Sequence, residues 1–309
     1  MAEKTVPIFP RTPVSCQLDS CASGLARRRC LVWSRIRQGT SPERDDHSSK
    51  RDAMLRIADS LRKYVLTAVD GEIGQFDDFF FDDMHWTIRY IVADTGEWIR
   101  ESLVLISPYS IRSLQEDSKL IETNMTVEQI EKAPKIDSGE QMSRQFEVAY
   151  NMYYGWPHYW AEPGVWGASA IPMPMTPRIG ESPEASEAGW NADLHSGREA
   201  EGFHIIASDG EVGHVAGFIL DDIDWTIRYF VIDTKNWWPG KHVLLAPHWA
   251  GRVDWGEQQV HVDISRDVIR EAPPFDPHSF VTRDYEAQLC TYYHKDAYWT
   301  GTDCATKPK

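Results

Sequence analysis

A gap-free internal repeat constrains this chain more than any other feature. Residues 64–160 and 203–299 align at a constant shift of 139 positions, and 30 of the 97 aligned positions are identical. The shared motifs are Asp-Gly-Glu-x-Gly at 70–74 and 209–213, an acidic pair at 82–83 and 221–222, Trp-Thr-Ile-Arg-Tyr at 86–90 and 225–229, and Tyr-Tyr…Tyr-Trp closing each copy. Self-similarity of this length at one shift indicates a duplicated structural unit. The chain is therefore predicted to contain two copies of one domain.

Each copy reads as a series of short strands followed by helices. The expected strands in the first copy are 64–68, 72–81, 86–94, 103–106, 109–114 and 119–123, with turns at 70–71 and 82–85. Alternation of Trp86, Ile88 and Tyr90 with polar neighbours predicts a half-buried strand. Thr126 with Gln129 three residues later is typical of a capping box, which opens a short helix. A second helical run, 140–154, is expected to end at Gly155. We expect a mainly β fold with short helices: two small barrels, each followed by a C-terminal helix and related by a pseudo-two-fold.

The repeat sets the expected domain boundaries. Residues 1–53 show neither repeat nor periodicity and are predicted to be a disordered tail, so that Met54 is an alternative start of the chain. The predicted parts are a first repeat over 54–160 that opens with a helix at 54–63, a linker over 161–200, a second repeat over 201–301 and a tail over 302–309. The linker contains Pro163, Pro172, Pro174, Pro177 and Pro183, a composition typical of extended segments. Its Trp166 and Trp190 are unusual for a free linker and are expected to dock on a barrel.

Charge and cysteine content narrow the classes of partner and compartment. The formal charge is −15, and because residues 1–53 carry +4 the remainder carries −19. Nucleic acids and anionic membranes are polyanions, so this acidity disfavours them as partners. The sequence contains neither an 18-residue apolar run nor a secretory signal. Reduced cysteines are expected at 16, 21, 30, 290 and 304, and the predicted compartment is the cytoplasm, with peripheral membrane association as an alternative.

The combined motifs resemble those of the PRC-barrel family. Asp-Gly-Glu-x-Gly, the acidic pair, Trp-Thr-Ile-Arg-Tyr and the following Asp-Thr carry the resemblance in both copies, about two thirds of the chain. The family is named for the cytoplasmic domain of the photosynthetic reaction centre H subunit. The resemblance implies a binding and scaffolding module without chemistry of its own. This chain differs from the H subunit because its barrel is duplicated and no transmembrane anchor is apparent.

Several residue groups are candidate sites. The pairs Asp82-Asp83 and Asp221-Asp222 are interpreted as turn residues rather than cation ligands, because adjacent side chains on a strand point to opposite faces. Arg89 and Arg228 are interpreted as barrel-surface side chains paired with Asp or stacked on an aromatic ring, with a partner contact as the alternative. The second-copy histidines 204, 214, 242, 248 and 261 match no zinc spacing. No catalytic, cofactor or metal residue is predicted.

The aromatic ends of the copies are the candidate interface. These residues are Tyr153, Tyr154, Trp156, Tyr159 and Trp160 in the first copy and Tyr292, Tyr293, Tyr298 and Trp299 in the second. Tyr and Trp are favoured at interfaces, so they predict either partner contacts or packing of each end onto a barrel of the same chain. Both interpretations stay open at this point.

The predicted function is that of a non-enzymatic interaction or scaffold protein. A contact between the two barrels within the chain is expected, with homo-oligomerisation as a further alternative, and the protein partner is unknown. The first functional alternative is a peripheral accessory of a photosynthetic or membrane electron-transfer assembly. The second is a protein that binds a metal or a small molecule. No cofactor is expected.

Overall fold

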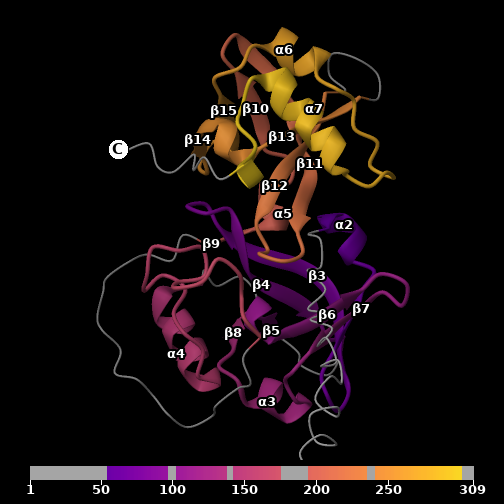
Figure 1. The fold of residues 1–309 in the computed structure, drawn as a ribbon. Helices are drawn as coiled ribbons and strands as arrows, with labels where there is room; N and C mark the ends of the chain where they lie inside the picture. Colours follow the sequence, from indigo (N-terminus) through magenta and orange to yellow (C-terminus); the bar gives the residue numbers. More distant parts are fainter. Residues whose placement is uncertain (1–53, 97–101, 138–141, 175–193, 235–240, 301–309) are drawn as a thin grey trace, which may run out of the picture. The chain divides into compact units, whose positions relative to one another are not determined.

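Two β-sheets, one from each copy of the repeat, form the framework of the chain. The computed structural model describes residues 54–96, 102–137, 142–174, 194–234 and 241–300 (Figure 1). Six helices and many more strands lie in these ranges, so the expected mainly β fold with few helices is confirmed. The described sheets have end strands that do not pair with each other, and each sheet is therefore open.

The first copy contains the strands β2 (Val65–Thr67), β3 (Glu72–Asp82), β4 (Thr87–Asp94), β5 (Ser102–Ile106), β6 (Ile111–Gln115), β7 (Leu120–Thr123) and β8 (Ile136–Asp137). They follow the order β6-β7-β2-β3-β4-β5-β8. Before them lie β1 (Leu55–Ile57) and α2 (Ala58–Leu61), and after them α3 (Val127–Lys132) and α4 (Arg144–Tyr154).

The second copy repeats this arrangement with β10 (His204–Ala207), β11 (Gly210–Asp221), β12 (Ile227–Asp233), β13 (His242–Leu245), β14 (Ala250–Asp254) and β15 (Gln259–Val262). Its strand order, β14-β15-β10-β11-β12-β13, matches the order β6-β7-β2-β3-β4-β5 of the first copy, which has β8 as an additional strand at the end. β9 (Leu194–Ser196) and α5 (Gly197–Ala200) precede it, and α6 (Arg266–Glu271) and α7 (Arg283–Tyr293) follow. The duplication in sequence is thus a duplication in topology.

The Asp-Gly-Glu-x-Gly motif connects the first hairpin of each copy to the rest of the sheet. The Asp70 carboxylate accepts a hydrogen bond of 2.8 Å from the backbone N–H of Val127, and Asp209 does the same for Arg266. At the last glycine, Gly74, an added Cβ would overlap the carbonyl of Asp94 on the neighbouring strand. Gly213 has the same surroundings in the second copy. The motif therefore caps a helix and permits close strand packing.

Several local predictions are confirmed. The side chain of Thr126 accepts a hydrogen bond from the backbone of Gln129 and the side chain of Gln129 bonds back, which completes the capping box that opens α3. The helix α4 ends at Gly155, whose φ of 68° is left-handed. The side chain of Ser143 caps its first turn.

Other local predictions are wrong. The expected helix over 54–63 is a three-residue strand followed by the four-residue helix α2. Residues 194–200, expected in the linker, form β9 and α5. The strand expected to be half-buried, β4, is buried on both faces. The reason is that side chains cover both faces: Arg89 lies beneath the ring of Tyr159 on one face, and Tyr90 packs against Tyr150 of α4 on the other, with ring centroids 5.4 Å apart.

The two copies exchange their first strands. β1, which precedes the first copy, pairs antiparallel with β11 of the second, and Leu55, Arg56 and Ile57 face Asp221, Leu220 and Ile219. β9, which precedes the second copy, pairs with β3 of the first, and Leu194, His195 and Ser196 face Asp82, Phe81 and Phe80. Each pairing becomes the other when its residue numbers are moved by 139. The two segments, β1–α2 and β9–α5, are called the exchanged arms below.

Candidate functional site

The β3–β4 turn of the first copy contacts the β11–β12 turn of the second copy, and this contact is called the crossing below. The backbone N–H of Ile88 donates to the carbonyl of Trp225 at 2.8 Å, and that of Ile227 donates to Trp86 at 2.7 Å. Both tryptophans have left-handed backbone angles, with φ of 54° and 61°. A bulky residue in this conformation costs on the order of 1–3 kcal/mol, so the surroundings must hold it there. The cost recurs at the same place in both copies because each carbonyl bonds to the other copy.

The first aspartate of each acidic pair orders its own turn and pairs with an arginine on the next strand. Asp82 accepts from the backbone N–H of His85 at 2.7 Å and from Nε of Arg89 at 2.6 Å. Asp221 likewise accepts from the backbone of Ile223 and from Arg228. The interpretation of these residues as turn residues is confirmed.

The second aspartate of each pair contacts the exchanged arm of the other copy. Asp222 accepts from Nε of Arg56 at 2.8 Å. At the matching position of the other arm, His195 stacks on Trp255 with ring centroids 3.3 Å apart, and the Trp255 indole N–H donates to Asp83 at 3.1 Å. The recurrent acidic pair therefore fixes both the strand within a copy and the arm between copies.

Arg89 is fully enclosed in the first copy. Its guanidinium lies 3.9 Å from the ring centre of Tyr159 and 4.7 Å from that of Trp166, and its Nη1 donates to the carbonyl of Val165 at 2.6 Å. The expected pairing and stacking are confirmed, but the expected surface position is wrong because Arg89 is only 1% exposed. Burial raises the pKa of the Asp82 carboxyl, but the positive charge of Arg89 and the bonds from His85 outweigh burial and hold the pKa below its usual value.

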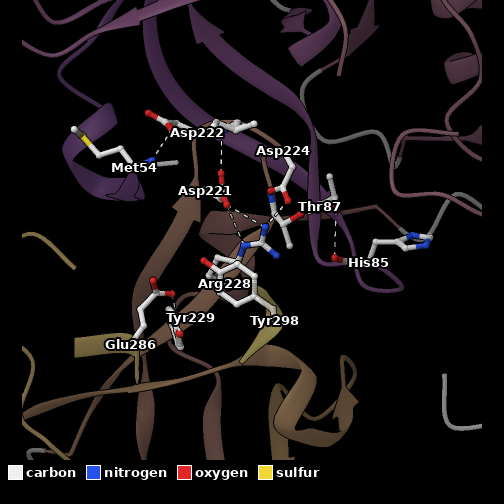
Figure 2. Close-up of polar contacts among 12 residues, drawn as sticks. Met54, His85, Thr87, Asp221, Asp222, Asp224, Arg228, Tyr229, Glu286 and Tyr298 are labelled. Carbon is white, nitrogen blue, oxygen red and sulfur yellow. Dashed lines mark hydrogen bonds and ion pairs between the residues drawn. The ribbon is translucent and has the colours of Figure 1, made fainter. Parts of the chain in front are cut away.

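Arg228 is the more open counterpart. Its guanidinium bonds Asp221 at 3.0 Å, also bonds Asp224, and lies 4.0 Å from the ring centre of Tyr298 (Figure 2). Its side chain is 16% exposed, against 0% for Arg89. Burial raises the pKa of Asp224, although Arg228 opposes the shift. A cavity of about 190 Å³ lies beside this cluster.

A buried glutamate supports each cluster from the long helix. Glu147 of α4 accepts from the hydroxyls of Tyr90 at 3.2 Å and Tyr159 at 2.9 Å and pairs with Arg144 at 2.6 Å. In the second copy Glu286 accepts from Tyr229 at 3.0 Å (Figure 2). Burial raises the pKa of Glu147 to about 7.

Sequence reasoning missed these two glutamates. The signal was present, because Arg144 and Glu147 recur unchanged as Arg283 and Glu286 at the shift of 139. Charged residues that recur on an expected helix read as a solvated face, whereas here the carboxylates are buried beneath the tyrosines.

The aromatic ends pack within the chain to different extents in the two copies. The buried members are Tyr154, Trp156, Tyr159 and Tyr293, the half-buried members are Tyr153, Trp160, Tyr292 and Tyr298, and Trp299 is 36% exposed. Tyr154 and Trp156 stack with ring centroids 4.4 Å apart. Trp166 of the expected linker is buried as well, and its ring centroid lies 5.0 Å from that of Tyr109. Trp190 lies outside the described residues.

The candidate histidines and cysteines do not form a metal site in the part of the chain that the structure describes. His204 contacts Glu211 at 2.8 Å, and within the described ranges the side chains include no group of three or more placed to hold a metal ion. Cys290 is a free thiol whose pKa is raised by burial. The other four cysteines, at 16, 21, 30 and 304, lie outside the described residues.

A scan against models of protein families and a search of curated proteins return no match for this chain. No helix in the described part of the chain is long and apolar enough to cross a membrane. The charged groups at the crossing bond to one another, and the arms and turns there fasten the two copies together.

Proposed function

We propose that this chain is a non-enzymatic interaction protein, a scaffold built from two PRC-type barrel modules related by a pseudo-two-fold. The observation that carries the proposal is the reciprocal exchange of arms, in which β1 pairs with β11 and β9 pairs with β3. An exchange fastens two small domains into one body, which offers a partner two related surfaces at a fixed spacing.

The chemistry at the crossing supports a structural role for its charged residues. A catalytic acid or base must reach a reacting group, yet Arg89, Asp82 and Glu147 are all buried and bonded to side chains of the same copy. Removing one partner of such a pair would leave the other as an uncompensated buried charge. Their geometry fits a structural role better than turnover.

Two exposed aromatic side chains on the second copy, Trp299 and Phe280, are the residues that we assign to a protein partner. Trp299 is 36% exposed, and Arg283 at the start of α7 lies 4.2 Å from the centre of its ring. Phe280, three residues before Arg283, is 69% exposed. In the first copy the equivalent of Trp299 is Trp160, which is covered by His158 at a ring distance of 4.7 Å. Ala297 occupies the position of His158 in the second copy, so Trp299 loses that cover.

The test is a native mass spectrum of the chain purified gently from its own host. We expect a protein partner in fixed stoichiometry with the unaltered chain. The double variant Phe280→Ser/Trp299→Ser should lose that partner, whereas Val69→Ser, which alters an apolar residue of 56% exposure in the first copy, should keep it. A chain that purifies without a partner, or a partner that the double variant retains, would argue against the proposal.

A further inference from the structure

The indole ring of Trp166 occupies a defined socket in the first copy. Its walls are the Arg89 guanidinium at 4.7 Å, the Tyr109 ring at 5.0 Å and the Tyr159 ring at 6.4 Å, measured between centres. The indole N–H donates to the backbone carbonyl of Asp224, in the other copy, at 2.8 Å. The first copy therefore shows which chemistry this socket accepts: a planar ring against a guanidinium and a tyrosine, with one N–H aimed at a carbonyl.

In the described part of the second copy, the corresponding residues surround an open cavity. The residues 139 positions beyond Arg89, Tyr109 and Tyr159 are Arg228, His248 and Tyr298, and the residue 139 positions before Asp224 is His85. All four line the cavity of about 190 Å³. Beyond the aligned repeat, the same shift of 139 takes Trp166 to position 305, which is alanine. The duplicated sequence thus keeps the socket while lacking the ring that fills it in the first copy.

Size and polarity define what the open socket can hold. An apolar cavity of about 150 Å³ accepts a benzene ring, so a volume of about 190 Å³ accommodates a somewhat larger ring system. Within the described ranges, the carbonyl of His85 accepts one hydrogen bond, from the hydroxyl of Thr87 at 3.2 Å, and a carbonyl has two lone pairs. One acceptor site is therefore left for a ring N–H.

The charges around the cavity favour a neutral ring. Asp221 and Asp224 both bond to Arg228, so the cluster offers no net positive charge to an anion. The guanidinium of Arg228 stacks on Tyr298 at 4.0 Å, and both side chains line the cavity, so a neutral ring can pack beside them (Figure 2). A fused aromatic heterocycle with one N–H donor meets each of these conditions.

We propose that the cavity beside Arg228 binds a small molecule of the indole class, with its ring packed beside the stacked Arg228 and Tyr298 side chains, as Trp166 packs beside Arg89 and Tyr159, and its N–H donating to the carbonyl of His85. This site goes beyond the proposed interaction function. It gives the second copy a ligand that the first copy replaces with its own Trp166.

Calorimetric titration of the full chain with indole tests the proposal. We expect one molecule bound per chain, and Trp166→Ala should open the first socket and raise the number to two. His248→Tyr, which installs the residue found in the first copy, should keep the affinity within about threefold. Tyr298→Ala should lower it at least tenfold. Zero binding to the unaltered chain, or unchanged binding to Tyr298→Ala, would overturn the proposal.

Two further probes fix the orientation and the source of the ring. 1-Methylindole lacks the N–H and should bind at least tenfold more weakly than indole; equal affinities would contradict the hydrogen bond to His85. N-acetyltryptophanamide carries the same ring on a peptide-like backbone. Preference for free indole is the expected result, whereas tighter binding of the amide would overturn the small-molecule assignment in favour of a tryptophan side chain. These measurements do not depend on whether a protein partner binds at Phe280 and Trp299.

Discussion

At the scale of single residues, buried Arg89 and its partly exposed counterpart Arg228 differ in how many carboxylates neutralise them. Within the described residues, Arg89 pairs with Asp82 alone, whereas Arg228 pairs with both Asp221 and Asp224. Removing one partner of a buried pair leaves an uncompensated charge and typically costs about 3–5 kcal/mol. Because a second carboxylate remains beside Arg228, the matching change in the second copy should cost less.

We therefore predict that Asp82→Asn lowers the free energy of unfolding by about 3–5 kcal/mol, and Asp221→Asn by roughly 1–2 kcal/mol. Both asparagines keep the oxygen that accepts the turn hydrogen bond from His85 or Ile223. Urea unfolding followed by tryptophan fluorescence measures the difference. Equal losses would show that Asp224 does not share the charge of Arg228.

Glu147 makes the stability of the first copy depend on pH. Its pKa is about 7 in the folded chain against an ordinary 4.5, because burial disfavours the carboxylate. The folded state thus keeps a proton that the unfolded state has released, and stability falls as the pH rises from about 4.5 through 7. With 1.36 kcal/mol per pKa unit, the loss is roughly 3 kcal/mol at most.

Glu147→Gln should remove this part of the pH dependence, since glutamine stays neutral while its carbonyl can accept from Tyr90 and Tyr159. Unfolding free energies at pH 5 and pH 8 should differ less in this variant than in the unaltered chain. Glu162→Gln, at an exposed position, is the control and should leave the difference unchanged. A variant that loses as much stability as the unaltered chain between these pH values would refute the assignment.

At the scale of elements, the arm β9–α5 depends on a small residue at its contact with β3. A Cβ added at Gly197 would overlap the buried ring of Phe79. The corresponding residue of the other arm is Ala58, which packs near β11 without such a conflict. The two arms therefore dock with different steric limits.

Gly197→Ala should destabilise the chain by about 1–3 kcal/mol, because Phe79 is enclosed and cannot move aside without repacking. Adding Phe79→Leu should recover part of the loss by making room for the methyl group. Thermal unfolding of the single and double variants measures this coupling. A stabilising effect of Gly197→Ala would mean that the arm does not press on Phe79.

The arms also mark the limit of what the sequence could predict. The repeat, the β-rich composition, the turns and the capping box at Thr126 follow from local patterns and were predictable. The exchange was not, because over residues 54–63 and 193–202 only Leu55 and Leu194 are identical. Strand pairing uses backbone hydrogen bonds, which place little demand on side-chain identity. The open socket beside Arg228 was equally hidden, since it depends on how residues from both copies meet.

At the scale of the whole molecule, the exchange implies that one copy alone is incomplete. Without β9, strand β3 would expose a backbone edge along residues that now pair with the arm. The crossing would also lose the reciprocal bonds between Ile88 and Trp225 and between Ile227 and Trp86. The sequence of the first copy nevertheless contains the arm that a second copy of itself would need: β1 can pair with β3 in the same register that it uses on β11.

A fragment of residues 54–160 should therefore form a symmetric homodimer by exchanging its arms. The equivalence of Leu55↔Asp221 and Leu194↔Asp82 predicts that Leu55 of one fragment faces Asp82 of the other. Sedimentation equilibrium should give twice the fragment mass at micromolar concentration. A fragment of residues 64–160, which lacks the arm, should instead aggregate or unfold because the edge of β3 stays open. A stable monomer of either fragment would show that the copies do not need each other, and the exchange would then be a consequence of the covalent linkage rather than the reason that the copies occur as a pair.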